Sequence, residues 1–158
     1  MSSMEVAARV GALLKARHQT IAVAESSAGG LIAARLLAVP GASAYFLGAA
    51  VVYTAPAREA FLEIGLPGMQ GMRAASEPYA VLLAERVKLQ LGADWGLSET
   101  GAAGPAGNRY GDPAGHSCMA VAGLVPMRRT LETGRADRAE NMEAFAEAAL
   151  LLMEEALK

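Results

Sequence analysis

Residues 20–31, which read TIAVAESSAGGL, constrain the fold of this chain more than any other segment. Residues 20–24 are apolar and partly β-branched, a pattern typical of a buried strand. Gly29 and Gly30 follow, and the apolar residues after them recur at helical spacing. The segment therefore predicts a strand, a tight turn and a helix. Three polar residues occupy the predicted turn: Glu25, Ser26 and Ser27.

The hydroxyl groups at this turn have more than one plausible use. The first amide N–H groups of a helix have no partner inside the helix, and the helix dipole is positive there. Such a turn can bind a phosphate, or it can stabilise an oxyanion beside a serine nucleophile. In the plainer alternative, Ser26 or Ser27 only caps the helix, and the glycines only permit close packing of the helix on the sheet.

Length and composition limit the class of protein. A chain of 158 residues, 53% of them hydrophobic, predicts a single domain over residues 1–158 with a substantial core. No apolar run approaches the ~20 residues of a spanning helix, and the N-terminus lacks the layout of a secretory signal. The one cysteine, Cys118, excludes an internal disulfide and a cysteine-rich metal site. With a net charge of −2 and no basic stripe, we expect a cytoplasmic protein that binds neither nucleic acid nor membrane.

The rest of the chain alternates between strand and helix patterns. Helices are predicted to begin after cap residues, namely Ser3, Thr54, Ser76 and Asp137. Besides the first strand, strands are predicted over residues 45–53, 94–100, 116–124 and 127–133, the last two as a hairpin. Residues 45–53 are apolar almost throughout, so we expect burial on both faces of that strand. Together these patterns predict a three-layer α/β/α domain on a mixed β-sheet.

Polar groups follow several of the predicted strands. Ser26, Thr54 and Thr100 all fall at strand ends, where ligands collect in open α/β sheets. A second glycine-rich segment begins at Thr100, and its glycines would let backbone amides approach a phosphate or carboxylate. Those glycines are Gly101, Gly104 and Gly107. Neither segment matches a P-loop or a dinucleotide-binding fingerprint.

These same residues resemble the CinA C-terminal domain family of competence/damage-inducible proteins. Residues 24–35, AESSAGGLIAAR, are similar to that family's Glu-Ser-Cys-Thr-Gly-Gly motif, and residues 100–105, TGAAGP, to its Gly-Ile-Ala-Gly-Pro loop. Intermediate family segments are matched by residues 39–46, 51–54 and 75–77. The similarity runs in order from about residue 5 to residue 156, so it covers the whole chain.

The resemblance implies an amidohydrolase that converts nicotinamide mononucleotide and water into nicotinic acid mononucleotide and ammonia. The family's serine nucleophile corresponds to Ser26, and two further catalytic positions correspond to Tyr53 and Thr100. A small nucleotide or amide ligand is implied, with no cofactor and no metal, in a stand-alone copy of the domain. The substrate-binding residues that follow from the motifs are Glu25, Ser27, Gly29, Gly30, Gly101, Gly104 and Gly107.

The chain departs from the family at the expected general base. Active members are similar to Tyr-Ser-x-x-x-Lys, whereas this chain reads YTAPAR from Tyr53 to Arg58. A buried lysine can lose its proton and act as a base, but an arginine effectively cannot. Two alternatives to the enzyme therefore stay open: a binding domain that kept the pocket and lost the base, and a structural module that forms oligomers.

Two structural expectations follow. Ser26, Tyr53, Arg58, Thr100 and the backbone of residues 101–107 are predicted to line one cavity at the strand ends. Apolar and small residues at 42–46 and an apolar loop at 66–72 are typical of a subunit interface. We therefore expect a homodimer or a larger closed oligomer.

Overall fold

The protein contains one mixed five-stranded sheet within residues 2–158, which the computed structural model describes. The strands are β1 (Ile21–Glu25), β2 (Phe46–Val51), β3 (Trp95–Ala102), β4 (His116–Ala122) and β5 (Met127–Glu132). They lie in the order β2-β1-β3-β4-β5. Strand β1 runs parallel to both neighbours, whereas the β3–β4 and β4–β5 pairs are antiparallel. The mixed sheet and its late hairpin are therefore confirmed.

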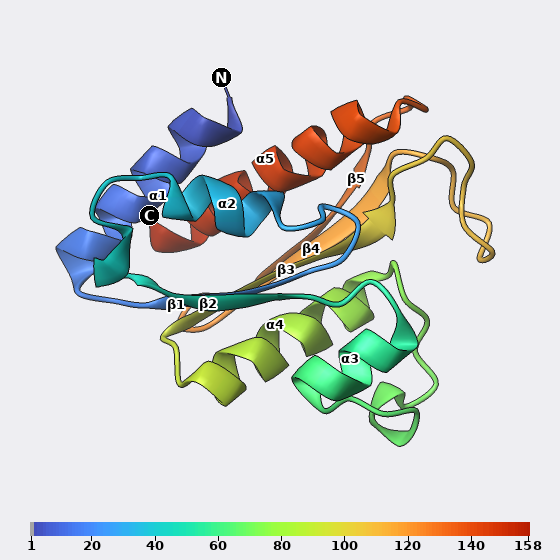
Figure 1. Ribbon diagram of the computed structural model, residues 1–158, viewed down its shortest axis with the longest axis horizontal. Coiled ribbons are helices and arrows are strands. Elements are labelled where there is room, and N and C mark those ends of the chain that lie inside the picture. Colours follow the sequence, from blue (N-terminus) through green and yellow to red (C-terminus); the bar gives the residue numbers. More distant parts are fainter. Residues whose placement is uncertain (1) are drawn as a thin grey trace.

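Helices cover both faces of this sheet. The α-helices are α1 (Ser3–Arg17), α2 (Leu31–Leu37), α3 (Ala55–Leu62), α4 (Glu77–Leu91) and α5 (Arg138–Leu157), with short 3₁₀ helices η1 (Ala42–Ala44) and η2 (Pro67–Met69). Helices α1, α2 and α5 lie above the sheet in Figure 1, and α3 and α4 lie below it. The predicted α/β/α layering is confirmed. None of the helices within residues 2–158 is both long and apolar enough to span a bilayer.

Each face of the sheet has its own apolar core. The core under α1, α2 and α5 includes Tyr45, Trp95 and Phe145, all fully buried. The core over α3 and α4 is built around Leu62 and Leu83. Burial of apolar surface is the dominant favourable term in folding, so these two cores hold the layers together.

Most helices start where the cap residues predict. Thr54, Ser76 and Asp137 each accept a hydrogen bond from the first turn of α3, α4 and α5 respectively. The first helix differs by one residue, because Ser2 is its cap and forms a capping box with Glu5. The adjacent Ser3 is buried and donates to Glu143 of α5.

Strand β2 is not buried on both faces, so that prediction is wrong. It lies at the edge of the sheet, with β1 as its one neighbouring strand, and its residues alternate between half-buried and exposed. The expected interface residues of the preceding segment also differ. Tyr45 is fully buried, with its hydroxyl donating to Leu36 O at 2.6 Å, and Ala42 is buried as well. These two side chains belong to the core and not to a surface patch.

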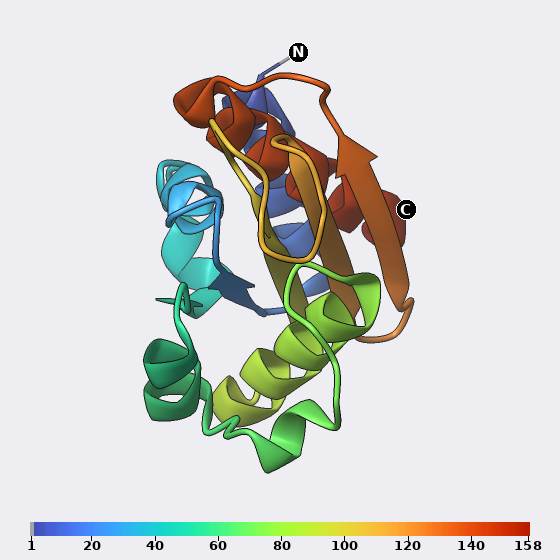
Figure 2. The same cartoon turned by 90° about the vertical axis from the view of Figure 1, so that its right-hand side faces the viewer.

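The carboxyl ends of the parallel strands β1, β2 and β3 point to one edge of the molecule, which Figure 2 views end-on, and β3 extends three residues beyond the other two. The register pairs Glu25 of β1 with Val51 of β2 and with Glu99 of β3. Ser26 therefore follows β1 at the level of Thr100, which lies within β3, so the predicted strand end after Thr100 falls two residues later, at Ala102. Parallel strands place their carboxyl ends at one edge, where open α/β sheets form their ligand sites.

Candidate functional site

Two carboxylates lie beneath the turn that follows β1. Glu25 and Glu99 are register partners on adjacent strands, and each is 0% exposed. A charged group in such a place costs several kcal/mol unless hydrogen bonds compensate it. The backbone and hydroxyl donors of residues 26–33 supply most of those hydrogen bonds. The two glutamates therefore hold the shape of the turn.

Glu25 caps the start of α2 from below. Its Oε1 accepts from Gly30 N at 3.0 Å and from Ile32 N at 3.1 Å, and its Oε2 accepts from Ala33 N at 2.8 Å. Burial raises the pKa of Glu25 to about 7, against the opposing effect of these N–H donors, and the charge of Glu99 adds to the rise. Since the protein's own carboxylate uses these amides, they are not left for a bound phosphate.

Glu99 holds the beginning of the same turn. Its Oε1 accepts from Ser26 N at 3.1 Å and from Ala28 N at 2.7 Å. Its Oε2 accepts from Ser117 Oγ at 3.1 Å and from Ser27 Oγ in a short hydrogen bond. Burial raises the pKa of Glu99, and these four donors oppose the rise. Glu99 was not among the site residues predicted from the sequence.

Ser26 is the residue of the turn whose hydroxyl is left unengaged. Its side chain is half-buried, and within residues 2–158 no hydrogen bond reaches its Oγ. The amides of Ser26 and Ala28 donate to Glu99, whereas the Ser27 N–H donates to no other group in the described part of the chain. The turn thus presents one unpaired hydroxyl and, one residue later, one unpaired amide.

The two threonines predicted beside Ser26 are both engaged. Thr100 is buried, and its Oγ1 accepts from Ala75 N at 3.1 Å, which ties β3 to the segment before α4. Thr54 Oγ1 accepts from Ala57 N at 3.2 Å as the cap of α3. Their hydrogen bonds give both threonines a structural role, whether or not either also meets a ligand.

Tyr53 lies two residues beyond β2 and is 59% exposed. Its hydroxyl accepts from Arg138 Nη2 at 3.1 Å, and Arg138 Nη1 donates to Gly104 O at 2.5 Å. Arg138 is the first residue of α5, so one side chain joins the end of β2, the loop after β3 and the start of the last helix. Sequence reasoning missed Arg138, because it was only the residue after the predicted cap Asp137.

Arg58 contacts the lower layer of the protein. Its Nε donates to Ile64 O at 3.0 Å, and its guanidinium lies near enough to the Tyr79 hydroxyl on α4 to act on the pKa of that group. Burial raises the pKa of Tyr79, while Arg58 partly offsets the rise. No hydrogen bond joins Arg58 to Ser26 within residues 2–158. Arg58 thus links α3 to α4.

The glycines of the second glycine-rich segment are explained by close packing within the protein. A Cβ at Gly101 would lie 2.3 Å from His116 O, and one at Gly107 would lie 2.1 Å from Asp112 O. Gly104 has φ +117°, and its added Cβ would lie 2.6 Å from Ala136 O. A role of these three glycines in binding a substrate stays a prediction.

The long loop after β3 is tied to its surroundings at several points. Asp112 pairs with Arg73 at 2.7 Å. Burial by itself would raise the pKa of Asp112, but hydrogen bonds from Arg73 and Asn108 lower it. At the loop's far end, His116 contacts Glu132 through Nδ1 at 2.6 Å and Ala75 O through Nε2 at 2.7 Å. His116 thus joins β5 to the segment before α4.

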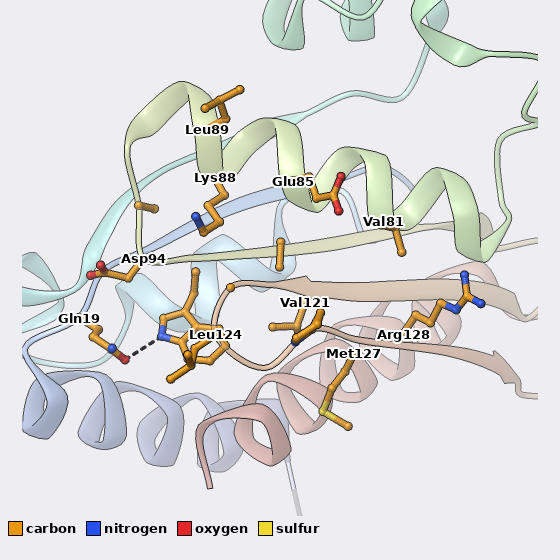
Figure 3. Close-up of a pocket in the computed structure, with 15 residues that line it drawn as sticks. Gln19, Val81, Glu85, Lys88, Leu89, Asp94, Val121, Leu124, Met127 and Arg128 are labelled. Atoms are coloured by element: carbon orange, nitrogen blue, oxygen red, sulfur yellow. Dashed lines mark hydrogen bonds between the residues drawn. The ribbon is translucent and has the colours of Figure 1, made fainter.

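A large groove lies elsewhere in the molecule. Its volume is about 1040 Å³, and it runs between α4 and the β4–β5 hairpin (Figure 3). Gln19 and Asp94 border it, and they precede β1 and β3, so the groove reaches the opposite end of the sheet from Ser26. Both acidic and basic side chains line it, including Glu85, Lys88 and Arg128. None of the sequence-predicted site residues is part of its lining.

Comparison with known proteins gives consistent results. A sequence model of the family described as "CinA C-terminal domain" matches residues 3–157. A CinA-like protein of Chlorobium limicola is 38% identical over 146 residues, which cover 89% of this chain and 34% of the relative. The chain thus spans about a third of the length of such curated relatives.

Two crystal structures have closely similar folds. A CinA superfamily protein from Klebsiella pneumoniae superposes with a TM-score of 0.92 at 25% identity, covering 99% of this chain and 98% of that one. A competence/damage-inducible protein from Agrobacterium tumefaciens gives a TM-score of 0.91 at 26% identity, with 99% and 96% covered. Both similarities extend over nearly the whole chain.

Proposed function

The chain belongs to the CinA C-terminal domain family, and from this premise we propose that it hydrolyses the carboxamide of nicotinamide mononucleotide. The products are nicotinic acid mononucleotide and ammonia, and Ser26 is the nucleophile. The substrate follows from the resemblance of the motifs to active members of the family. The role of Ser26 has independent support in the geometry of the turn.

The observation that carries the proposal is the state of the Ser26 hydroxyl. Ser26 stands at the carboxyl end of a central parallel strand, and its Oγ has no hydrogen-bond partner within residues 2–158. The hydroxyls of Ser27 and Thr100, by contrast, are both engaged. Glu25 and Glu99 hold the backbone on both sides of Ser26, which pre-organises its position for attack.

The reaction proceeds in two steps. Ser26 Oγ attacks the carboxamide carbon and loses its proton, and the carbonyl oxygen becomes an oxyanion. The C–N bond then breaks, the nitrogen leaves as ammonia after taking a proton, and an ester to Ser26 remains. Water cleaves that ester to give the carboxylic acid and to restore the serine. The unpaired Ser27 N–H is the candidate donor to the oxyanion, one residue after the nucleophile.

The proton of Ser26 needs an acceptor that Arg58 cannot provide. A guanidinium stays protonated, and Arg58 is bound to Ile64 O. Glu25 and Glu99 are fully buried and accept hydrogen bonds from the turn, so Tyr53 is the candidate acid–base side chain at these strand ends, and Arg138 holds its oxygen. General-base assistance is typically worth about 10²–10⁴-fold in rate. We therefore expect slower turnover than in family members that carry the lysine.

Arg58 also favours a second candidate function. A domain that keeps the nucleotide site but has no base would bind nicotinamide mononucleotide without hydrolysing it. The two functions differ in one observable, the release of ammonia.

The test is to incubate the purified protein with nicotinamide mononucleotide and to measure ammonia and nicotinic acid mononucleotide together. The enzyme hypothesis expects both products in equal amounts and their loss in Ser26→Ala. Ser43 is an exposed serine on η1, and Ser43→Ala is therefore the matched control, which should keep wild-type activity. Binding of the substrate by calorimetry with no product would support the binding domain and contradict the enzyme.

A further inference from the structure

The two edges of the sheet differ sharply in charge. Strand β5 carries Arg128, Arg129 and Glu132 among its six residues, and the two arginines pair with Glu77 and Glu155. Charged side chains on an edge strand are a standard protection against pairing with another chain. Strand β2 has the sequence FLGAAV and carries no charge and no proline. The β2 edge therefore lacks the protection that the β5 edge has.

The neutral stretch extends well beyond β2 itself. No residue of 36–57 is charged, and the nearest charged residues are Arg35 and Arg58. Both of these bind inside the chain, Arg35 to Glu143 and Arg58 to Ile64 O. Their charged groups are thus already engaged by other parts of the fold.

The backbone of β2 offers hydrogen bonds on its outer side. The N–H group of Val52 donates to Glu25 O at 2.8 Å, so the amide of Val52 points toward β1. Amide direction alternates along a strand, and the N–H groups of Ala49 and Val51 therefore point away from β1. No strand within residues 2–158 lies on that side. A partner with an extended backbone would satisfy these groups.

Apolar side chains flank the same edge on both faces of the sheet. Those that are exposed include Leu37 (55%), Leu47 (46%), Val51 (41%), Phe61 (60%) and Leu91 (44%). Below the strand, between α3 and α4, a hollow of about 400 Å³ is lined by apolar side chains apart from Gln90. Exposed apolar patches beside an unprotected edge mark an interaction surface.

We propose that this edge binds a second copy of the chain, so that two β2 strands pair antiparallel about a two-fold axis. At a two-fold axis each side chain faces its own counterpart or a near neighbour, so like charges would repel across it. A strand with no charge over residues 36–57 is electrostatically compatible with itself. The pairing joins the two sheets into one and covers the apolar side chains of both copies.

The proposal does not depend on the amidohydrolase activity, because it concerns the outer edge of β2 and not the turn that contains Ser26. It does place the interface beside the site, because Tyr53 is only two residues past the end of β2. This interface overlaps the predicted segment 42–46 at Phe46, the first residue of β2, whereas Ala42 and Tyr45 of that segment are buried.

The first test measures the mass of the protein in solution by light scattering at micromolar concentrations. Wild type is expected as a dimer. Leu47→Lys puts a charge on the edge and should raise the dissociation constant by about 100-fold or more. Leu89→Lys is the matched control: Leu89 is 76% exposed on α4, lines the other groove and should leave the dimer intact. A monomeric wild type, or a Leu47→Lys protein that stays dimeric, overturns the proposal.

The second test locates the axis and does not rely on weakening the fold. Single cysteines are introduced at Leu47, Ala49 and Val51, and disulfide formation between copies is followed under mild oxidation. The native Cys118 is buried and should not react. At least one β2 variant is expected to cross-link efficiently, while Arg128→Cys on β5 does not. Cross-linking at β5 with none at β2 would refute the pairing.

Discussion

Ser26 owes its availability to two residues that themselves do not meet solvent. Glu99 takes the donors on one side of the turn and Glu25 takes those on the other, so the serine hydroxyl is left without an internal partner. Because each carboxylate accepts several hydrogen bonds from the turn, both are tolerated at 0% exposure in adjacent strands. It also means that the position of Ser26 depends on two carboxylates buried beneath the turn.

Replacing Glu99 should therefore be costly. Glu99→Leu keeps much of the volume but removes both acceptor oxygens, which takes away the partner of the buried Ala28 N–H and of the Ser27 hydroxyl. We expect the free energy of unfolding to fall by about 3 kcal/mol, since each unsatisfied buried group costs about 1–3 kcal/mol. Urea unfolding measures this loss. Ser117→Ala removes a single hydrogen bond to Glu99 and should cost about 1 kcal/mol; equal losses in the two variants would contradict the account.

Arg58 offers a second prediction at this scale. Arg58→Lys introduces a side chain that can lose its proton, so the rate of ammonia release from nicotinamide mononucleotide should rise by about tenfold or more. Arg86→Lys is the control, because Arg86 also joins α4 to the end of α3 through Leu62 O and Glu63 O. If wild-type turnover is robust and falls in Arg58→Lys, then Tyr53 rather than position 58 acts as the base.

At the scale of elements, the start of α2 couples stability to pH. The pKa of Glu25 is about 7 in the folded protein against an ordinary value of 4.5. Folded Glu25 therefore binds more protons than unfolded Glu25 between these values. Its contribution to stability is complete below the unfolded pKa and is lost as pH rises through the folded pKa.

We expect the free energy of unfolding to decrease between about pH 5 and about pH 8, by roughly 3 kcal/mol from Glu25 alone at ~1.4 kcal/mol per pKa unit. Glu99, whose pKa is also raised, acts in the same direction. Glu25→Gln should flatten this decrease, whereas Glu59→Gln on the exposed face of α3 should not. Urea titrations at a series of pH values provide the measurement. A wild type and a Glu25→Gln variant with the same slope would rule out Glu25 as the source.

Helix α5 contributes to the site through its first residue. Arg138→Ala removes the link between Tyr53 and Gly104 O, so Tyr53 should lose its fixed position. We expect kcat on nicotinamide mononucleotide to drop roughly tenfold or more, because misplacement of a reacting group is costly, with little change in thermal stability. Arg135 is an exposed arginine three residues before Arg138, and Arg135→Ala is the matched control. An unchanged kcat in Arg138→Ala would remove this arginine from the site.

Local sequence signals predicted the elements well where they act within a few residues. Cap residues such as Ser76 and Asp137 set helix starts through hydrogen bonds to their own first turn. The burial of strand β2, by contrast, depends on its position in the sheet and not on residues nearby in the sequence. An apolar run is expected both in a fully buried strand and in an edge strand that awaits a partner, and only the sheet order separates the two.

At the scale of the whole molecule, the motifs identified Ser26 and the strand ends but not the residues that support them. Glu99 looked like one more residue of β3, although an acid directly before Thr100 repeats the placement of Glu25 before Ser26. Arg138 reaches Tyr53 across 85 residues of sequence, and no local pattern reports such a contact. The family resemblance therefore gave the candidate nucleophile, and the tertiary structure gave its surroundings.

The molecule offers two regions where a nucleotide could be sought: the strand ends around Ser26, and the groove of about 1040 Å³ between α4 and the β4–β5 hairpin. The groove is larger than many ligand sites, but it contains none of the motif residues. We propose that the substrate binds at the strand ends, where the motif residues lie.

The most direct test is the crystal structure of Ser26→Ala with nicotinamide mononucleotide, since the variant leaves the substrate intact. We expect the carboxamide carbon to lie about 3–3.5 Å from the position that the missing Oγ would occupy, with the carboxamide oxygen toward the Ser27 N–H. Nicotinamide mononucleotide bound in the groove beside Lys88 and Arg128, or with its carboxamide directed away from residue 26, would contradict the account.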